Sequence, residues 1–324
     1  MLVSVLLFAV GLVLLIKGGD WFVDGATGIA KRFNLPDIVV GATVVSIGTT
    51  LPEVMVSTTG ALQGSGAMAY GNAIGSIICN TALIAAISIV CNPGPVNTKS
   101  MKTPAIFFFC SAALYCLASY VLGEFPRWMG FVMLTIFVVY MVLTVRNGMK
   151  NPDSAHEEEE EESKPKALWQ ELLLLVIGAA VIAVGADLLV EHGQVIALGL
   201  GVPETVVALL FVALGTSLPE LVTTITSLRS GHASLGVGNV IGANVFNLVL
   251  VSGVAVSLAP FPVPMENELL NTGLNMSLVF EIPVMLGVMA LMIFPTLATK
   301  KLARWQGIAL LGIYAAFCIC QFVL

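Results

Sequence analysis

Apolar segments, each about 20 residues or longer, recur along the whole chain and constrain its fold more than any other feature. Of the 324 residues, 57% are hydrophobic and only 10% are charged, a composition that a soluble domain could not carry. In a bilayer the backbone must satisfy its own hydrogen bonds, which favours helices of this length. The sequence predicts an all-α polytopic membrane protein with ten transmembrane helices, at residues 1–24, 36–62, 67–91, 103–122, 127–147, 168–191, 203–229, 234–259, 273–295 and 304–323.

An acidic linker at residues 148–167 separates a first half at 1–147 from a second half at 168–324. The linker contains Asn-Pro, the glutamate run 157–162 and Lys-Pro-Lys, a composition typical of a solvated, disordered segment. A weak cation collector or a regulatory site is the alternative interpretation. The formal charge of −6 mostly reflects this glutamate run, so it does not indicate a nucleic-acid partner.

The basic residues predict the orientation in the membrane. If the N-terminus is outside, nearly all Lys and Arg residues fall in inner loops, and only Arg127 lies outside and Lys17 within the first span. We therefore expect a multi-pass protein of the cell (plasma) membrane with both termini extracellular and the acidic linker cytoplasmic. The first segment has no signal-peptide pattern and is expected to be a retained helix.

The two halves are internal repeats. A shift of 167 positions maps residues 18–80 onto the second half without a gap, so that Glu53 matches Glu220 and Asn80 matches Asn247. Each half holds five predicted spans, an odd number, so the second half crosses the membrane in the opposite sense. Two inverted five-helix repeats are typical of secondary transporters with a binding site at the membrane midplane.

Each repeat carries a polar motif in the middle of an apolar span: Gly-Thr-Thr-Leu-Pro-Glu at 48–53 and Gly-Thr-Ser-Leu-Pro-Glu at 215–220. Proline cannot donate a backbone hydrogen bond, so it frees a carbonyl one turn earlier, beside the glutamate. Carboxylates at membrane depth are costly and indicate function. Hard cations prefer such carboxylate and carbonyl oxygens.

Further polar residues share a helix face with these motifs at spacings of three or four positions. If the four helices pack together, their oxygens form a cage with a net charge of about −2, which suits Ca²⁺ or several Na⁺ ions and disfavours soft metals. Buried hydroxyls and amides can also simply join helices, and for Thr43, Thr59 or Asn72 alone we favour that interpretation. For Glu53 and Glu220 we expect ligands or proton carriers. The residues on this face are Ser46, Thr49, Thr50, Glu53, Ser57, Asn72, Ser76 and Asn80, and, in the second half, Ala213, Thr216, Ser217, Glu220, Thr224, Asn239, Ala243 and Asn247.

These motifs, with Gly-Asn-Ala-Ile-Gly-Ser-Ile-Ile-Cys-Asn at 71–80 and its copy at 238–247, resemble the two alpha repeats of the sodium/calcium exchanger family, of the prokaryotic type, within the cation/Ca²⁺ exchanger superfamily. The resemblance implies ten helices, outward termini and four adjacent cation positions between helices 2, 3, 7 and 8, with helices 1 and 6 sliding past them. It also implies that Ca²⁺ is held by Thr49, Glu53, Thr216 and Glu220. The sodium or central positions would be formed by Ser46, Thr50, Ser76, Asn80, Ala213, Ser217 and Asn247, with Ser46 and Ala213 acting through backbone carbonyls.

Two residues depart from the family pattern. Ala243 stands where the family usually has a serine ligand, which puts one sodium position in doubt, and Ile77 stands where the other half has Asn244. The second departure concerns packing more than ligation. Glu281, close to Pro283 in the ninth span, is either a proton site or a shallow residue near the helix end.

We expect a secondary active Na⁺/Ca²⁺ antiporter that works by alternating access, with Ca²⁺ and Na⁺ competing for the site between the two glutamates. The alternative is a Ca²⁺/H⁺ or K⁺-dependent Na⁺/Ca²⁺ exchanger, and the alternative of a different class is a passive cation channel. We expect no resident cofactor; the partners are the transported Ca²⁺ and Na⁺, with H⁺ or K⁺ as alternatives, and the lipid bilayer. No nucleophile with an adjacent base and no cofactor motif occurs, so we do not expect an enzyme.

Overall fold

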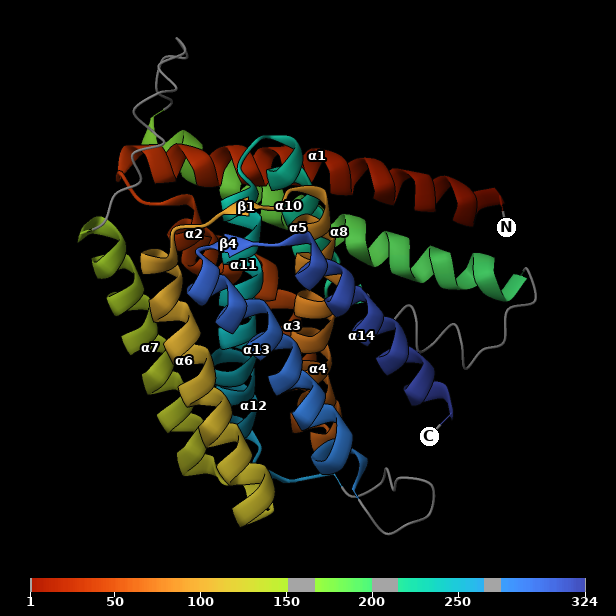
Figure 1. The fold of residues 1–324 in the computed structure, drawn as a ribbon. Coiled ribbons are helices and arrows are strands. Elements are labelled where there is room, and N and C mark those ends of the chain that lie inside the picture. Colours follow the sequence, from red (N-terminus) through yellow and green to blue (C-terminus); the bar gives the residue numbers. More distant parts are fainter. Residues whose placement is uncertain (1, 151–166, 200–214, 265–274, 324) are drawn as a thin grey trace.

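A computed structural model describes residues 2–150, 167–199, 215–264 and 275–323, and it contains ten helical segments arranged as a membrane protein (Figure 1). Eight of these segments are long and apolar enough to cross a bilayer. The other two, α10 (Leu218–Arg229) and α14 (Arg304–Val323), lie within the expected spans 203–229 and 304–323. The eight are α1 (Leu2–Arg32), α2 to α3 (Asp37–Leu62), α4 to α5 (Gly66–Cys91), α6 with η3 (Thr98–Leu122), α7 (Arg127–Lys150), α8 (Leu168–Gly199), α11 to α12 (Ala233–Leu258) and η7 with α13 (Ser277–Thr299).

The helices α1 and α8 are longer than the expected spans 1–24 and 168–191. The acidic residues near the expected end of the first span do not end the helix, because Asp24 is exposed on its surface and Asp20 pairs with Lys17 at 3.7 Å. The chain leaves the helix only near Asn34, whose φ of 48° is left-handed, and Pro36 follows. These charged residues thus lie on the surface of α1 and not at its C-terminal end.

The helices α1 and α8 run side by side, steeply inclined to the direction of α6, α7 and α13 (Figure 1). Glycines let the two backbones approach closely: a methyl group added to Gly178 would lie 2.6 Å from the backbone nitrogen of Phe22, and one added to Gly185 would lie 2.9 Å from that of Leu15. Close approach through small residues is a common way to pack membrane helices, where lipid gives no hydrophobic drive for association. At one end of the pair Arg32 binds Glu171 with its Nε 2.9 Å from Oε2.

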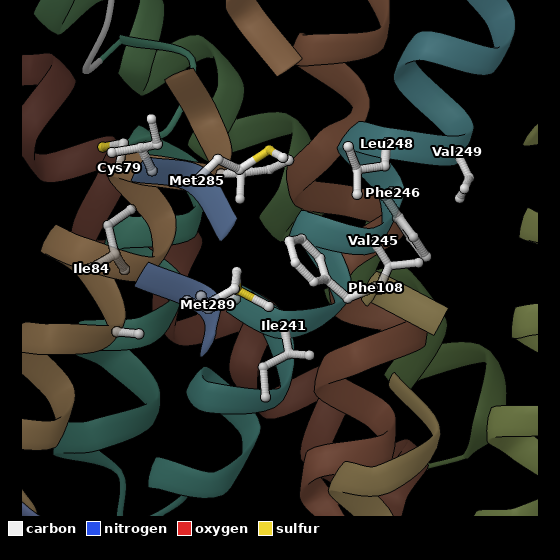
Figure 2. Close-up of a cluster of buried hydrophobic side chains, with 14 of the residues drawn as sticks. Cys79, Ile84, Phe108, Ile241, Val245, Phe246, Leu248, Val249, Met285 and Met289 are labelled. Carbon is white, nitrogen blue, oxygen red and sulfur yellow. The ribbon is translucent and has the colours of Figure 1, made fainter. Parts of the chain in front are cut away.

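Large apolar side chains fill the bundle beneath this pair. Figure 2 shows Phe108 of α6, Ile241 and Phe246 of α11, and Met285 and Met289 of α13 gathered in one cluster. All five are fully buried. Dense packing of this kind fixes α11 among its neighbours, and α11 carries part of the polar face expected from the sequence.

Two π-helical segments begin at equivalent positions of the repeats. The segment η2 (Asn80–Ala85) begins at Asn80, and η5 (Asn247–Val251) begins at Asn247. A third, η1 (Gly41–Val45), precedes α3 (Ser46–Leu62), and the Tyr140 hydroxyl donates to the Ala42 carbonyl within it at 2.7 Å. Such segments loosen the ladder of backbone hydrogen bonds and often occur at functional sites.

Two short antiparallel strand pairs join the halves at opposite ends of α6. The pair β1 (Gly94–Pro95) with β4 (Lys301–Leu302) lies before α6, and the pair β2 (Glu124–Phe125) with β3 (Phe261–Pro262) lies after η3 (Leu117–Leu122). We call these the β1–β4 end and the β2–β3 end of the bundle. Each pair takes one strand from each half of the chain.

Candidate functional site

Two carboxylates lie in the interior of the bundle without a partner. Glu53 of α3 and Glu220 of α10 are both 0% exposed, and none of their four side-chain oxygens has a hydrogen-bond partner among the described residues. The two side chains interact electrostatically with each other, and neither forms one of the ion pairs of the described chain. Burying a charge without a partner is very unfavourable. The pair therefore requires a bound cation or protons.

The surrounding oxygens show the same lack of partners. Polar side chains buried in proteins are nearly always hydrogen-bonded, yet several buried atoms near these motifs have no partner within the described chain. Hydroxyl, amide and carboxylate oxygens of this kind suit a hard cation. The buried atoms without a partner are Oγ1 of Thr50, Oδ1 and Nδ2 of Asn80, Oγ of Ser217 and Oδ1 of Asn247, and each of these residues is 0% or 1% exposed.

The two halves are joined at this place by matching contacts between threonine and asparagine. The Thr49 hydroxyl donates to Oδ1 of Asn239 at 3.1 Å, and the Thr216 hydroxyl donates to Oδ1 of Asn72 at 3.5 Å. The shift of 167 positions relates one contact to the other. The Ser46 hydroxyl also donates to Asn239, at 2.9 Å from its carbonyl and 3.2 Å from Oδ1.

Asn72 acts as a packing residue, in keeping with the interpretation made from the sequence. Its Nδ2 donates to the Ser57 hydroxyl at 2.8 Å and to the Glu53 carbonyl at 3.3 Å, which ties α4 (Gly66–Cys79) to α3. The Ser76 hydroxyl is 3.5 Å from Oδ1 of the same asparagine. Asn239 was expected from the sequence only as a member of the polar face, and its role as an acceptor for Ser46 and Thr49 was not.

A turn interrupts the second copy of the motif, after the helical Gly215. α10 starts at Leu218, after a turn at Thr216 and Ser217, whereas α3 runs through its copy of the motif with Pro52 inside the helix. Thr216 is half-buried in this turn. The turn exposes backbone groups beside Glu220, as expected for a hard-cation site.

The remaining expected residues divide into three groups. Ala213 lies outside the described residues. Ala243 is fully buried, and its carbonyl accepts from Nδ2 of Asn247 at 3.1 Å. Asn244 donates to the Thr81 hydroxyl at 2.7 Å, which is a packing role, and its counterpart Ile77 is also fully buried.

The site is rich in oxygen, although the buried Cys79 thiol lies near Ser217 and Glu220; within the described part of the chain no three His, Cys, Asp or Glu side chains come together to hold a metal. A soft transition metal would find too few suitable ligands there. Two carboxylates with neutral oxygens leave Ca²⁺ and Na⁺ as the fitting cations.

The helix α1 covers the site from one side. A cavity of about 10 Å³ lies between α1, α3, α8 and α10, and its lining includes Phe22, Thr49 and Pro219. Phe22 is fully buried, and its ring would lie 2.9 Å from a methyl group added to Gly48. A space of this size holds about one water molecule, so α1 blocks wider access here.

Known proteins resemble the chain over almost all of its length. It matches the family described as sodium/calcium exchanger protein over residues 3–146 and 171–323. An uncharacterized membrane protein of Methanocaldococcus jannaschii is 33% identical over 95% of this chain and 94% of the relative. The sodium/calcium exchanger MaX1 of Methanosarcina acetivorans is 29% identical over 99% of both chains.

The fold is also that of a solved transporter. A structure of the sodium-calcium exchanger NCX_Mj, soaked with 2.5 mM Na⁺ and 10 mM Sr²⁺, superposes with a TM-score of 0.79 at 31% identity and covers 97% of each chain. The resemblance expected from the motifs is thus confirmed, as is the expectation that the chain is not an enzyme. The chain belongs to the sodium/calcium exchanger family of membrane transporters.

Proposed function

We propose that this protein is a secondary active Na⁺/Ca²⁺ antiporter in which the two ions compete for a site between Glu53 and Glu220. The observation that carries this proposal is the pair of fully buried carboxylates with unpartnered oxygens. One Ca²⁺ or a set of Na⁺ ions neutralises the pair, whereas the empty site keeps two buried charges. The transporter with bound ions can therefore change conformation. The free energy cost of two buried charges disfavours that change when the site is empty.

We assign the ligands as the family motif implies. Ca²⁺ binds the carboxylates of Glu53 and Glu220 and the carbonyls of Thr49 and Thr216, since both threonine hydroxyls are engaged by asparagines. The Na⁺ positions and the central position use Ser46, Thr50, Ser76, Asn80, Ala213, Ser217 and Asn247. The unpartnered oxygens of Thr50, Asn80, Ser217 and Asn247 support this assignment.

The proposed architecture is ten transmembrane helices in two inverted repeats, at 1–147 and 168–324, joined by a cytoplasmic linker at 148–167. The equivalent π-helical starts at Asn80 and Asn247 and the matching threonine–asparagine contacts support the repeat. In the plasma membrane, the basic loops place both termini and the β2–β3 end outside.

Alternating access follows from the packing of α1 against α8. Their glycine-mediated contact lets the two helices move as one unit, and Phe22 lies over Gly48 at the edge of the site. We propose that sliding of this unit uncovers the carboxylates on one side of the membrane at a time.

Flux in proteoliposomes tests the function. Vesicles loaded with Na⁺, K⁺ or a proton excess are diluted into medium with ⁴⁵Ca²⁺, one gradient at a time. We expect Ca²⁺ uptake driven by internal Na⁺ alone. Uptake driven by protons, or uptake that needs K⁺ together with Na⁺, would instead support the alternative exchangers, for which the missing hydroxyl at Ala243 is the specific argument. Uptake without any counter-ion gradient would indicate a passive channel.

A further inference from the structure

The carboxylate of Glu281 lies away from the central site, at the β2–β3 end of the bundle. It is the last residue of η7 (Ser277–Glu281) and is half-buried. Its Oε2 accepts from the Ser277 hydroxyl at 2.7 Å, and its Oε1 accepts from the Gln321 amide of α14 at 3.0 Å. Each of the two carboxylate oxygens thus accepts one hydrogen bond. None of the ion pairs within the described residues includes Glu281.

Two unpartnered hydroxyls face the same place. The Tyr70 side chain of α4 lies beside Ser119 of η3 and Ser277 of η7, and it interacts electrostatically with Glu281. Tyr70, Ser119 and Ser277 are 1%, 3% and 4% exposed. The hydroxyls of Tyr70 and Ser119 lie near each other but form no hydrogen bond of good geometry, either with each other or with another group of the described chain. Buried hydroxyls in that state indicate a bound species that they can coordinate or hydrogen-bond.

The backbone geometry supports a binding role at this position. Both Ser119 and Glu281 lie in π-helical segments, which release backbone carbonyls and are frequent at functional sites. The Tyr120 hydroxyl donates to the Leu278 carbonyl and holds these two segments together. Hydroxyls from α4 and η3 therefore lie beside Ser277, which contacts the Glu281 carboxylate.

We propose that Glu281, Ser277, Tyr70 and Ser119 form a binding site for one alkali-metal cation, Na⁺ or K⁺. A single carboxylate balances a single positive charge, and the neutral oxygens around it are hydroxyls, which suit a hard monovalent ion better than a divalent ion that needs more negative charge. The site shares no residue with the cage around Glu53 and Glu220. It therefore does not depend on the ligands proposed there.

Radioactive ²²Na⁺ binding to purified full-length protein tests this site. In the Glu53→Gln/Glu220→Gln background, which removes both central carboxylates, we expect one saturable Na⁺ site to remain. Adding Glu281→Gln should weaken it by roughly tenfold or more, the scale of one lost interaction with a charged group. Adding Tyr70→Phe, which removes only one hydroxyl, should weaken it less. Competition by unlabelled K⁺ and Na⁺ then ranks the two ions.

The matched control is Glu124→Gln in β2, an exposed glutamate at the same end of the bundle. It should bind Na⁺ like the background. Equal affinity in the Glu281→Gln and Glu124→Gln proteins would overturn the proposal, as would a background that binds no Na⁺. If Glu281→Gln does not fold, an unchanged Na⁺ affinity in Tyr70→Phe would also overturn the proposal. If the background keeps several Na⁺ sites and Glu281→Gln removes only one, the central ligand assignment fails while this site stands.

Discussion

The Thr49 hydroxyl donates to the side-chain oxygen of Asn239, 3.1 Å away, and so joins α3 of the first half to α11 of the second. The corresponding contact between Thr216 and Asn72 is longer, at 3.5 Å. Because both hydroxyls point to asparagines, the threonine carbonyls beside the glutamates are the groups left for a cation. The asparagines therefore hold the two threonines in place beside the glutamates.

We expect Asn239→Ala to lower the free energy of unfolding by about 1–3 kcal/mol, because the buried Thr49 hydroxyl loses its acceptor. Its Ca²⁺ affinity should fall as well, since α3 is no longer held in place. Thermal unfolding and Ca²⁺ titration of the detergent-purified protein measure both effects. Asn147→Ala, at an exposed contact with Thr103, is the control and should behave like the parent protein. An unaltered affinity in Asn239→Ala would remove the positioning role.

Glu53→Gln and Glu220→Gln should each abolish ⁴⁵Ca²⁺ uptake while the protein still folds. Either change leaves a single carboxylate to bind a divalent ion. The free energy cost of removing Ca²⁺ from water is then left uncompensated, at several kcal/mol. The neutral amide also removes the cost of the empty site, so the unfolding temperature without Ca²⁺ should not fall. Glu191→Gln, on the exposed side of α8, serves as the control. Normal uptake in either of the first two variants would refute the assignment of the site.

Ala243→Ser should strengthen competition of Na⁺ against Ca²⁺, and Ser76→Ala should weaken it. One hydroxyl contributes about 0.5–1.5 kcal/mol, or roughly three- to tenfold in affinity. Ca²⁺ affinity without Na⁺ should hardly change, because the assigned Ca²⁺ ligands are elsewhere. Calorimetric Ca²⁺ titrations across a Na⁺ series measure the effect. If both variants keep the parent's Na⁺ dependence, these two positions are packing contacts only.

Arg32→Gln should destabilise the contact between α1 and α8, because it leaves the Glu171 carboxylate, 5% exposed, without its cation. Adding Glu171→Gln should restore part of the loss, since no buried charge then remains. The four unfolding temperatures of a double-mutant cycle give the coupling between the two side chains. Lys17→Gln removes an exposed pair with Asp20 and should have little effect. Additive changes at Arg32 and Glu171 would contradict the expectation.

The sequence predicted the helices well where apolar runs end at clear signals. The helices that begin at Arg127, Leu168 and Arg304 start where they were expected, because a charged or proline-rich segment precedes each. The extra length of α1 was missed, because an acidic residue such as Asp24 can lie either at the end of a helix or, as here, on an exposed face within it. Residue type alone does not distinguish these two situations.

The candidate ligands were also readable from the sequence, because carboxylates, amides and hydroxyls at helical spacing stand out in apolar segments. The role of Asn239 could not be read in this way, since its partners Ser46 and Thr49 come from the other half of the chain. Neither could the π-helical starts at Asn80 and Asn247, because a spacing of four positions fits an α-helix equally well.

The two strand pairs impose an order on biosynthesis. As the chain leaves the ribosome, β1 and β2 are made with the first five helices, but their partners β4 and β3 emerge only with the last helices. The first half must therefore stay in the membrane with both of its strand-bearing loops unpaired until the helices before β3 and β4 have been made. Assembly of the transporter is thus a late event, in which β3 closes one end of the bundle and β4 afterwards closes the other.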